Sequence, residues 1–73
     1  MRHERIEMNP AVMLGKPVVR GTRITVEHIL RRLGEGMAVE EILAAHPDLT
    51  AGDVRAVQAF AADYIAHEEL VRE

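Results

Sequence analysis

Apolar residues recur with helical spacing in three separate segments of the chain. Positions i, i+3, i+4 and i+7 lie on one face of a helix, so such a stripe marks the side that packs inward. The spacing predicts helices over residues 26–34, 39–46 and 51–70. Thr25 and Thr50 precede the first and third helices, where a hydroxyl can cap the free amides. The pattern is that of a mainly α chain.

The third predicted helix has the clearest start signal. Asp53 follows Thr50 by three residues, which is a shortened form of the capping box. Leu49 and Val54 occupy the positions of a hydrophobic staple. The helix over 51–70 is longer than a minimal three-helix domain needs, so its end is expected either to fray or to pack on a partner.

The first 25 residues have no helical periodicity and are predicted to be extended. Ile6 belongs to a short extended piece that ends at Asn9-Pro10, a turn-favouring pair. β-Branched residues favour strands at 17–20 and 23–25, and Gly21-Thr22 between them suits a two-residue type II′ turn. The N-terminal part is therefore predicted to contain a short β-hairpin.

The predicted turn places Arg20 and Arg23 opposite each other, although like charges in that position repel. An anion between the two guanidinium groups relieves the repulsion. Three sources of that anion are open: a nucleic-acid phosphate, a carboxylate of a partner protein, or an Asp or Glu of the second or third helix. The first two make the turn a binding site, and the third makes it structural.

The length of 73 residues allows a single domain, 1–73. A chain this short buries only about 60% of its unfolded surface. Its 35 apolar residues include ten alanines, so the core is thin and self-association would stabilise it. The absence of cysteine excludes disulfides and thiolate metal sites and predicts a cytoplasmic protein. No apolar run predicts a signal peptide or a membrane span.

Charge is distributed unevenly along the chain. Residues 1–32 carry seven Lys/Arg and three Asp/Glu, a net +4, whereas residues 33–73 carry two and nine, a net −7. Such polarity is typical of a protein with two partner surfaces, although the two halves can also attract each other within or between chains.

The second and third helices and the turn between them have the proportions of a helix-turn-helix. In that motif the start of the second helix reads the major groove. Here Arg55 is the only basic residue near that start, and Asp53 is expected to repel phosphate. The same pattern also fits two helices that simply pack a small α domain.

Enzyme chemistry is not indicated. The four histidines are 18 or more residues apart, there is no serine or cysteine nucleophile, and the paired carboxylates are adjacent in sequence and point apart on a helix. We predict no catalytic residue, no cofactor and no metal site.

A longer motif resembles a known family. The segments "GKPVVRGTRI", "LGEGM", "VEEILAAHPDLT" and "DVRAVQAFAA", with the Asn9-Pro10 turn, closely resemble the small bacterial proteins of the domain-of-unknown-function 433 family. The resemblance covers about residues 6–66. It implies a homeodomain-like or winged helix-turn-helix core, here of three helices with a short N-terminal β-hairpin.

The resemblance also implies a function. It implies an antitoxin of a type II toxin–antitoxin pair, which neutralises a PIN-like nuclease toxin with a carboxylate-lined site and represses its own operator DNA as a homodimer. A stand-alone DNA-binding regulator and a structural dimerisation module are the alternatives. The residues expected to contact nucleic acid or toxin are Lys16, Arg20, Gly21, Thr22, Arg23, Arg31, Arg32 and Arg55.

Overall fold

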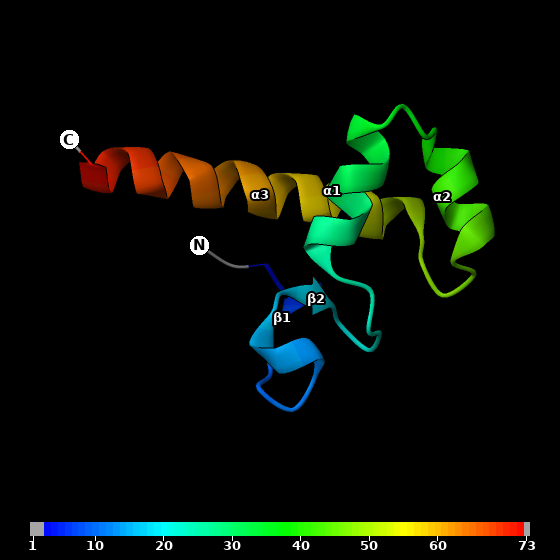
Figure 1. The fold of residues 1–73 in the computed structure, drawn as a ribbon, viewed down its shortest axis with the longest axis horizontal. Coiled ribbons are helices and arrows are strands. Elements are labelled where there is room, and N and C mark those ends of the chain that lie inside the picture. Colours follow the sequence, from blue (N-terminus) through cyan, green and yellow to red (C-terminus); the bar gives the residue numbers. More distant parts are fainter. Residues whose placement is uncertain (1–2, 73) are drawn as a thin grey trace.

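Three helices make up most of the computed structural model, which describes residues 3–72, with side chains described up to residue 67 (Figure 1). The helices are α1 (Val26–Gly34), α2 (Val39–Ala45) and α3 (Ala51–Arg72). Before them lie β1 (Ile6–Glu7), the 3-10 turn η1 (Met13–Gly15) and β2 (Val18–Val19). The mainly α class with a short two-stranded N-terminal element is confirmed. The second helix ends one residue earlier than predicted, and the third ends two residues later.

The helix starts follow the local sequence. The Thr25 hydroxyl accepts the His28 amide at 3.0 Å and caps α1. At the start of α3 the Thr50 hydroxyl accepts the Asp53 amide at 3.1 Å, while the Asp53 carboxylate accepts the Thr50 amide at 3.0 Å. The predicted shortened capping box is therefore confirmed. After α1, Gly36 adopts a φ of 95°, a left-handed conformation that glycine tolerates and that lets the chain turn back toward α2.

The core is small and draws on every helix and both strands. Each buried aliphatic side chain contributes about 1.5–3 kcal/mol relative to an exposed one. The fully buried apolar residues among those described are Ile6, Val18, Val19, Val26, Ile29, Ile42, Leu49, Val54 and Val57. Both residues of the predicted staple, Leu49 and Val54, belong to this set.

The N-terminal strands pair differently from the predicted hairpin. β2 pairs antiparallel with β1, with Ile6 opposite Val19. The segment 23–25 contributes a single bridge, between Val18 and Thr25. A longer second pairing cannot form because the chain enters α1 directly after Thr25, whereas Ile6 gains burial by pairing.

The turn after β2 is offset by one residue from the predicted one. The Thr22 amide donates to the Val19 carbonyl at 3.0 Å, so Arg20 and Gly21 are its central residues. Gly21 has a φ of 81°, the sign that the second central position of a type II turn requires. The predicted type II′ turn centred on Gly21-Thr22 is therefore wrong, because glycine takes the second central position instead of the first.

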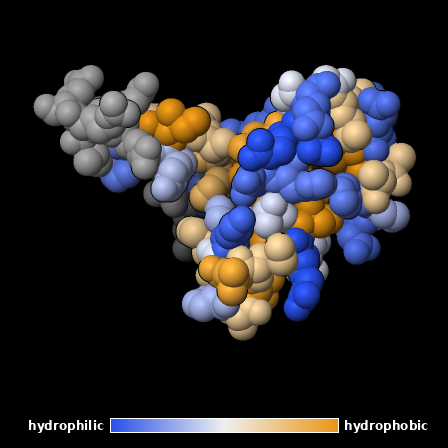
Figure 2. All heavy atoms as spheres, viewed as in Figure 1, coloured by the Kyte–Doolittle hydropathy of each residue, from blue (hydrophilic) through white to orange (hydrophobic). Residues whose placement is uncertain are grey.

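The C-terminal half of α3 extends away from the other elements (Figure 1). With 22 residues the helix is about 33 Å long, whereas the buried residues of α3 lie between Asp53 and Val57. Figure 2 shows apolar side chains reaching the surface on this protruding half and around η1. Tyr64 and Ile65 are each 58% exposed. Within residues 3–72, no helix is long and apolar enough to cross a membrane.

Candidate functional site

The turn between β2 and α1 is closed by a threonine side chain. The Thr22 hydroxyl donates to the Val19 carbonyl at 2.8 Å and accepts the Ile24 amide at 3.0 Å. These two bonds, with the left-handed Gly21, fix the backbone without using any charged group. The turn consequently displays the two flanking arginines on a defined backbone.

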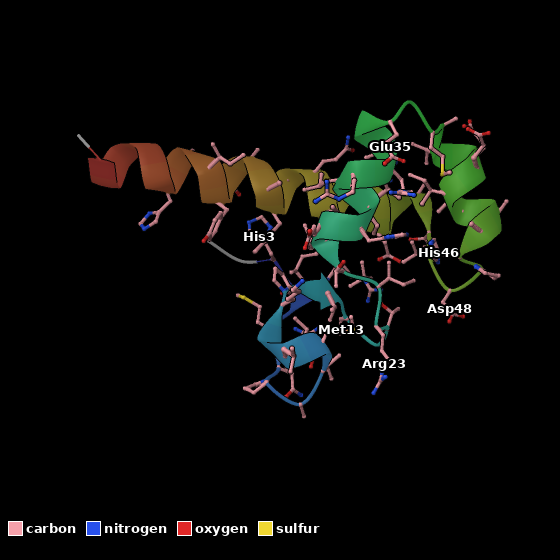
Figure 3. All side chains as sticks on the ribbon, viewed as in Figure 1. His3, Met13, Arg23, Glu35, His46 and Asp48 are labelled. Carbon is pink, nitrogen blue, oxygen red and sulfur yellow. The ribbon has the colours of Figure 1, made fainter. Side chains whose placement is uncertain are left out.

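The two arginines of the turn are held differently. Arg20 donates its amide to the Arg5 carbonyl at 2.7 Å and its Nε to the Glu4 carbonyl at 2.6 Å. Arg23 is exposed, points away from the rest of the molecule (Figure 3), and makes no hydrogen bond or ion pair to any residue from 3 to 72. The side-chain contact found for Arg20 is a backbone carbonyl. Of the three anion sources considered for this turn, carboxylates of α2 and α3 are not used in the described chain.

An arginine that sequence reasoning missed does meet a carboxylate of α3. Arg5 Nε donates to Asp53 Oδ1 at 2.8 Å, across 48 positions of sequence. The Asp53 side chain is only 3% exposed, whereas that of Arg5 is 52% exposed. Burial alone would raise the pKa of Asp53, but hydrogen bonds from Arg5 and the Thr50 amide outweigh it and lower that pKa. Asp53 therefore does not face a ligand, and the expectation that it repels phosphate is wrong.

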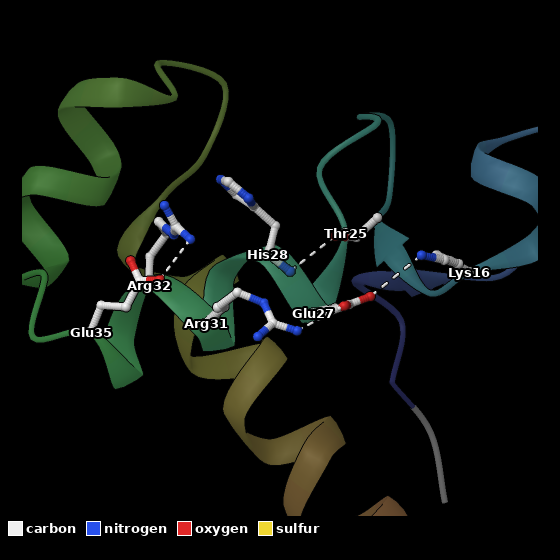
Figure 4. Close-up of polar contacts among 7 residues, drawn as sticks. All are labelled: Lys16, Thr25, Glu27, His28, Arg31, Arg32 and Glu35. Carbon is white, nitrogen blue, oxygen red and sulfur yellow. Dashed lines mark hydrogen bonds and ion pairs between the residues drawn. The ribbon is translucent and has the colours of Figure 1, made fainter.

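Lys16 and Arg31 share one carboxylate on α1 (Figure 4). Arg31 Nη2 lies 3.0 Å from Glu27 Oε2, and Lys16 Nζ lies 3.5 Å from Glu27 Oε1. The hydrogen bond from Arg31, followed by the charge of Lys16, lowers the pKa of Glu27. All three side chains are more than half exposed, so these pairs are weak and can exchange for an external anion. Together they carry a net charge of +1.

The remaining predicted residues lie apart from the turn. Arg32 pairs with Glu35 at 2.9 Å at the end of α1, and its Nε is buried without a partner in the described structure. Arg55 is exposed on α3 and has no ion-pair or hydrogen-bond partner among residues 3–72. The eight predicted residues thus fall into separate places: the turn, the Lys16–Arg31 pair, the end of α1 and the start of α3.

The helix-turn-helix face is poor in positive charge. Glu40 and Glu41 of α2 and Asp48 of the following turn are exposed, and Glu41 also accepts the Ala38 amide at 2.8 Å. Arg55 is the cation that α3 offers beside them. A phosphate backbone approaching this face would meet more carboxylates than cations.

Two histidine contacts were not foreseen from the sequence. The rings of His28 and His46 meet edge to face, with centroids 5.4 Å apart. His3 Nε2 lies 2.9 Å from Asp63 Oδ2 and ties the N-terminal segment to α3. Within the described chain, His, Cys, Asp and Glu side chains form no group of three that could hold a metal ion.

Comparison with known proteins assigns the family. The family model described as "Protein of unknown function (DUF433)" matches residues 6–61, which is most of the chain. The chain belongs to the DUF433 family. The match spans β1, the basic turn and all of α1 and α2, so the residues discussed above lie within the family domain.

Two relatives place this DUF433 domain in context. A crystal structure of a DUF433 member from Anabaena variabilis ATCC 29413 superposes with a TM-score of 0.80 at 27% identity, covering 94% of this chain and 69% of that one. The uncharacterized protein y4eO of Sinorhizobium fredii (strain NBRC 101917 / NGR234) is 36% identical over 58 residues, which are 80% of this chain and 26% of y4eO. This chain therefore spans about a quarter of the length of that relative.

Proposed function

We propose that this DUF433 protein is the antitoxin of a type II toxin–antitoxin pair and that its basic turn binds a PIN-like nuclease. The observation that carries the proposal is the state of Arg23. Its guanidinium group stands on a turn fixed by backbone and Thr22 hydrogen bonds and is not bound to any residue from 3 to 72. A cation presented on a rigid support suits an anionic partner.

The chemistry of guanidinium fits a nuclease target. A metal-dependent nuclease site is lined by carboxylates, and guanidinium forms two parallel hydrogen bonds with a carboxylate. Arg23 at such a site would supply the positive charge that the carboxylates otherwise find in a metal ion. The role of the protein in this proposal is binding, with no catalytic step of its own.

The second part of the proposal is binding to operator DNA. The acidic surface of α2 and its turn argues against reading by the helix-turn-helix face, as described above. The basic turn and the Lys16–Arg31 pair are better placed to contact phosphates, because they carry the net positive charge. A stand-alone regulator would use the same cations, so the toxin is what distinguishes the two hypotheses.

Co-expression with the product of the adjacent reading frame tests the toxin partnership. We expect a nuclease-like neighbour whose toxicity to growing cells is relieved by the wild-type protein and which co-purifies with it. The double substitution Arg20→Ala and Arg23→Ala should abolish both effects, whereas Arg55→Ala, the same change on a separate exposed surface, should preserve them. A neighbour without nuclease activity, or full rescue by the double variant, would refute the toxin partnership.

A gel-shift titration with the protein's own promoter fragment tests the DNA part. Affinity should fall steeply between low and physiological salt because phosphate contacts release counterions. Tight binding without any partner, together with a neighbour that is not a nuclease, would favour the stand-alone regulator. Absence of promoter binding by both the free protein and its complex would leave a protein-binding role alone.

A further inference from the structure

An apolar groove lies where the protruding half of α3 leaves α1. It has a volume of about 580 Å³. One wall is the flank of α1, the other is α3, and Met8 and Pro17 lie between them. The apolar wall residues are Val26 and Leu30 of α1 and Phe60, Ala61, Tyr64 and Ile65 of α3. Glu27 and Arg31 form a charged rim on the α1 side.

The α3 wall continues the stripe that packs in the core. Val57 is fully buried and Phe60 is partly buried against the core, whereas Tyr64 and Ile65 on the same side of the helix are 58% exposed. Phe60 and Tyr64 stack with centroids 6.1 Å apart, so this surface is ordered by its own aromatic rings. A helix normally places such a stripe against another element, and in the described chain none covers it beyond Phe60.

We infer that the groove receives α3 of a second copy of this chain, so that two protruding helices pack side by side around a two-fold axis. A two-fold interface must be self-complementary, with each residue set serving as both donor and recipient surface. This groove meets that condition because α3 both forms its wall and carries the uncovered stripe.

The charges on the two sides of this interface are complementary. From Ala61 to the C-terminus the sequence has four acidic residues and one basic residue, a net −3. The rim of the groove carries Glu27 bound by both Arg31 and Lys16, a net +1. A second copy entering the groove therefore brings an acidic helix to a basic rim, and the reverse occurs at the symmetry-related groove. This argument does not depend on the toxin or on DNA.

Size-exclusion chromatography with light scattering tests the inference on the free protein. We expect a mass of twice 8.2 kDa at micromolar concentration. Ile65→Glu places a charge in the groove and should weaken dimerisation on the order of a hundredfold, giving the monomer mass. Ala66→Glu adds the same charge at an exposed position outside the groove and should leave the dimer intact. Circular dichroism checks that both variants keep their helix content.

Single cysteines in this cysteine-free chain give a second readout that does not rely on a disruptive variant. Under oxidation, Ile65→Cys should cross-link two chains and Ala66→Cys should do so much less. A monomeric wild type, a dimeric Ile65→Glu, or equal cross-linking at both positions would overturn the inference. A wild type that is monomeric alone and uses the groove only with the adjacent-frame product would assign the groove to that protein instead.

Discussion

Arg5 and Arg23 show two opposite uses of the same side chain. Arg5 reaches across the fold to a carboxylate that is 3% exposed, and together they fasten the N-terminal segment to the start of α3. Arg23 stands on a turn whose shape depends on Thr22 and Gly21, and it is bound to no residue in the described chain. One guanidinium is therefore part of the fold, and the other contributes nothing to it that the structure records. That difference separates residues kept for stability from residues available for binding.

The largest expected effect is on the Arg5 side of this comparison. Arg5→Ala strands the buried Asp53 carboxylate, so the free energy of unfolding should fall by about 3 kcal/mol. Urea unfolding followed by circular dichroism measures the change. Adding Asp53→Asn removes the stranded charge, and the double variant should be more stable than Arg5→Ala alone. A double variant that is less stable still would show that the charge was not the cause.

Gly21→Ala comes next, because the turn depends on a left-handed residue. Its φ of 81° costs a residue with a side chain about 1–2 kcal/mol, although nothing lies within 4 Å of the added Cβ. Gly34→Ala is the matched control, since its added Cβ also meets open space but the residue is helical; alanine there should be neutral or stabilising. Equal unfolding free energies for the two variants would contradict the turn geometry.

Acid should weaken the Arg5–Asp53 contact. The folded-state pKa of Asp53 lies below its ordinary value of 3.8, so the unfolded chain binds the proton more readily. The contribution is fully present above about pH 4 and is lost as the pH falls through the folded-state pKa. The lowered pKa of Glu27 acts in the same direction, so the comparison must be made with Asp53→Asn. The loss of stability on acidification should be smaller in that variant, and an identical pH profile would refute the assignment.

The smallest effect on stability is expected at Arg23. Because its side chain makes no bond to residues 3–72, Arg23→Ala should change the unfolding free energy by less than about 0.5 kcal/mol. Thermal and urea unfolding of the variant and the wild type measure this directly. A loss comparable to that of Arg5→Ala would mean that Arg23 supports the fold after all, and the contrast between the two arginines would disappear.

Local signals in the sequence carried the helical part of the fold. Thr25 and Thr50 cap helices where their positions predicted, because a cap depends on residues within one turn. The pairing of β1 with β2 and the Arg5–Asp53 contact depend instead on segments 12 and 48 positions apart. Spacing along the chain gives no information about such contacts.

The candidate site was predictable only as a set of residue types. The excess of arginine around Gly21 identified the turn, but its sequence did not reveal which cations were already paired. Lys16, Arg31 and Arg32 each find a carboxylate on α1 or just after it, whereas Arg23 does not. Those outcomes depend on side-chain reach in the folded state.

Calorimetric titration of the adjacent-frame nuclease with the wild type, Arg23→Ala and Arg23→Lys tests the central claim most directly. If Arg23 is held for a partner's carboxylates, Arg23→Ala should weaken binding by about tenfold or more, since a charge-assisted hydrogen bond contributes about 1.5–3 kcal/mol. Arg23→Lys should lie between, because it keeps the charge but not the two-pronged geometry. Equal dissociation constants for all three proteins would contradict the claim.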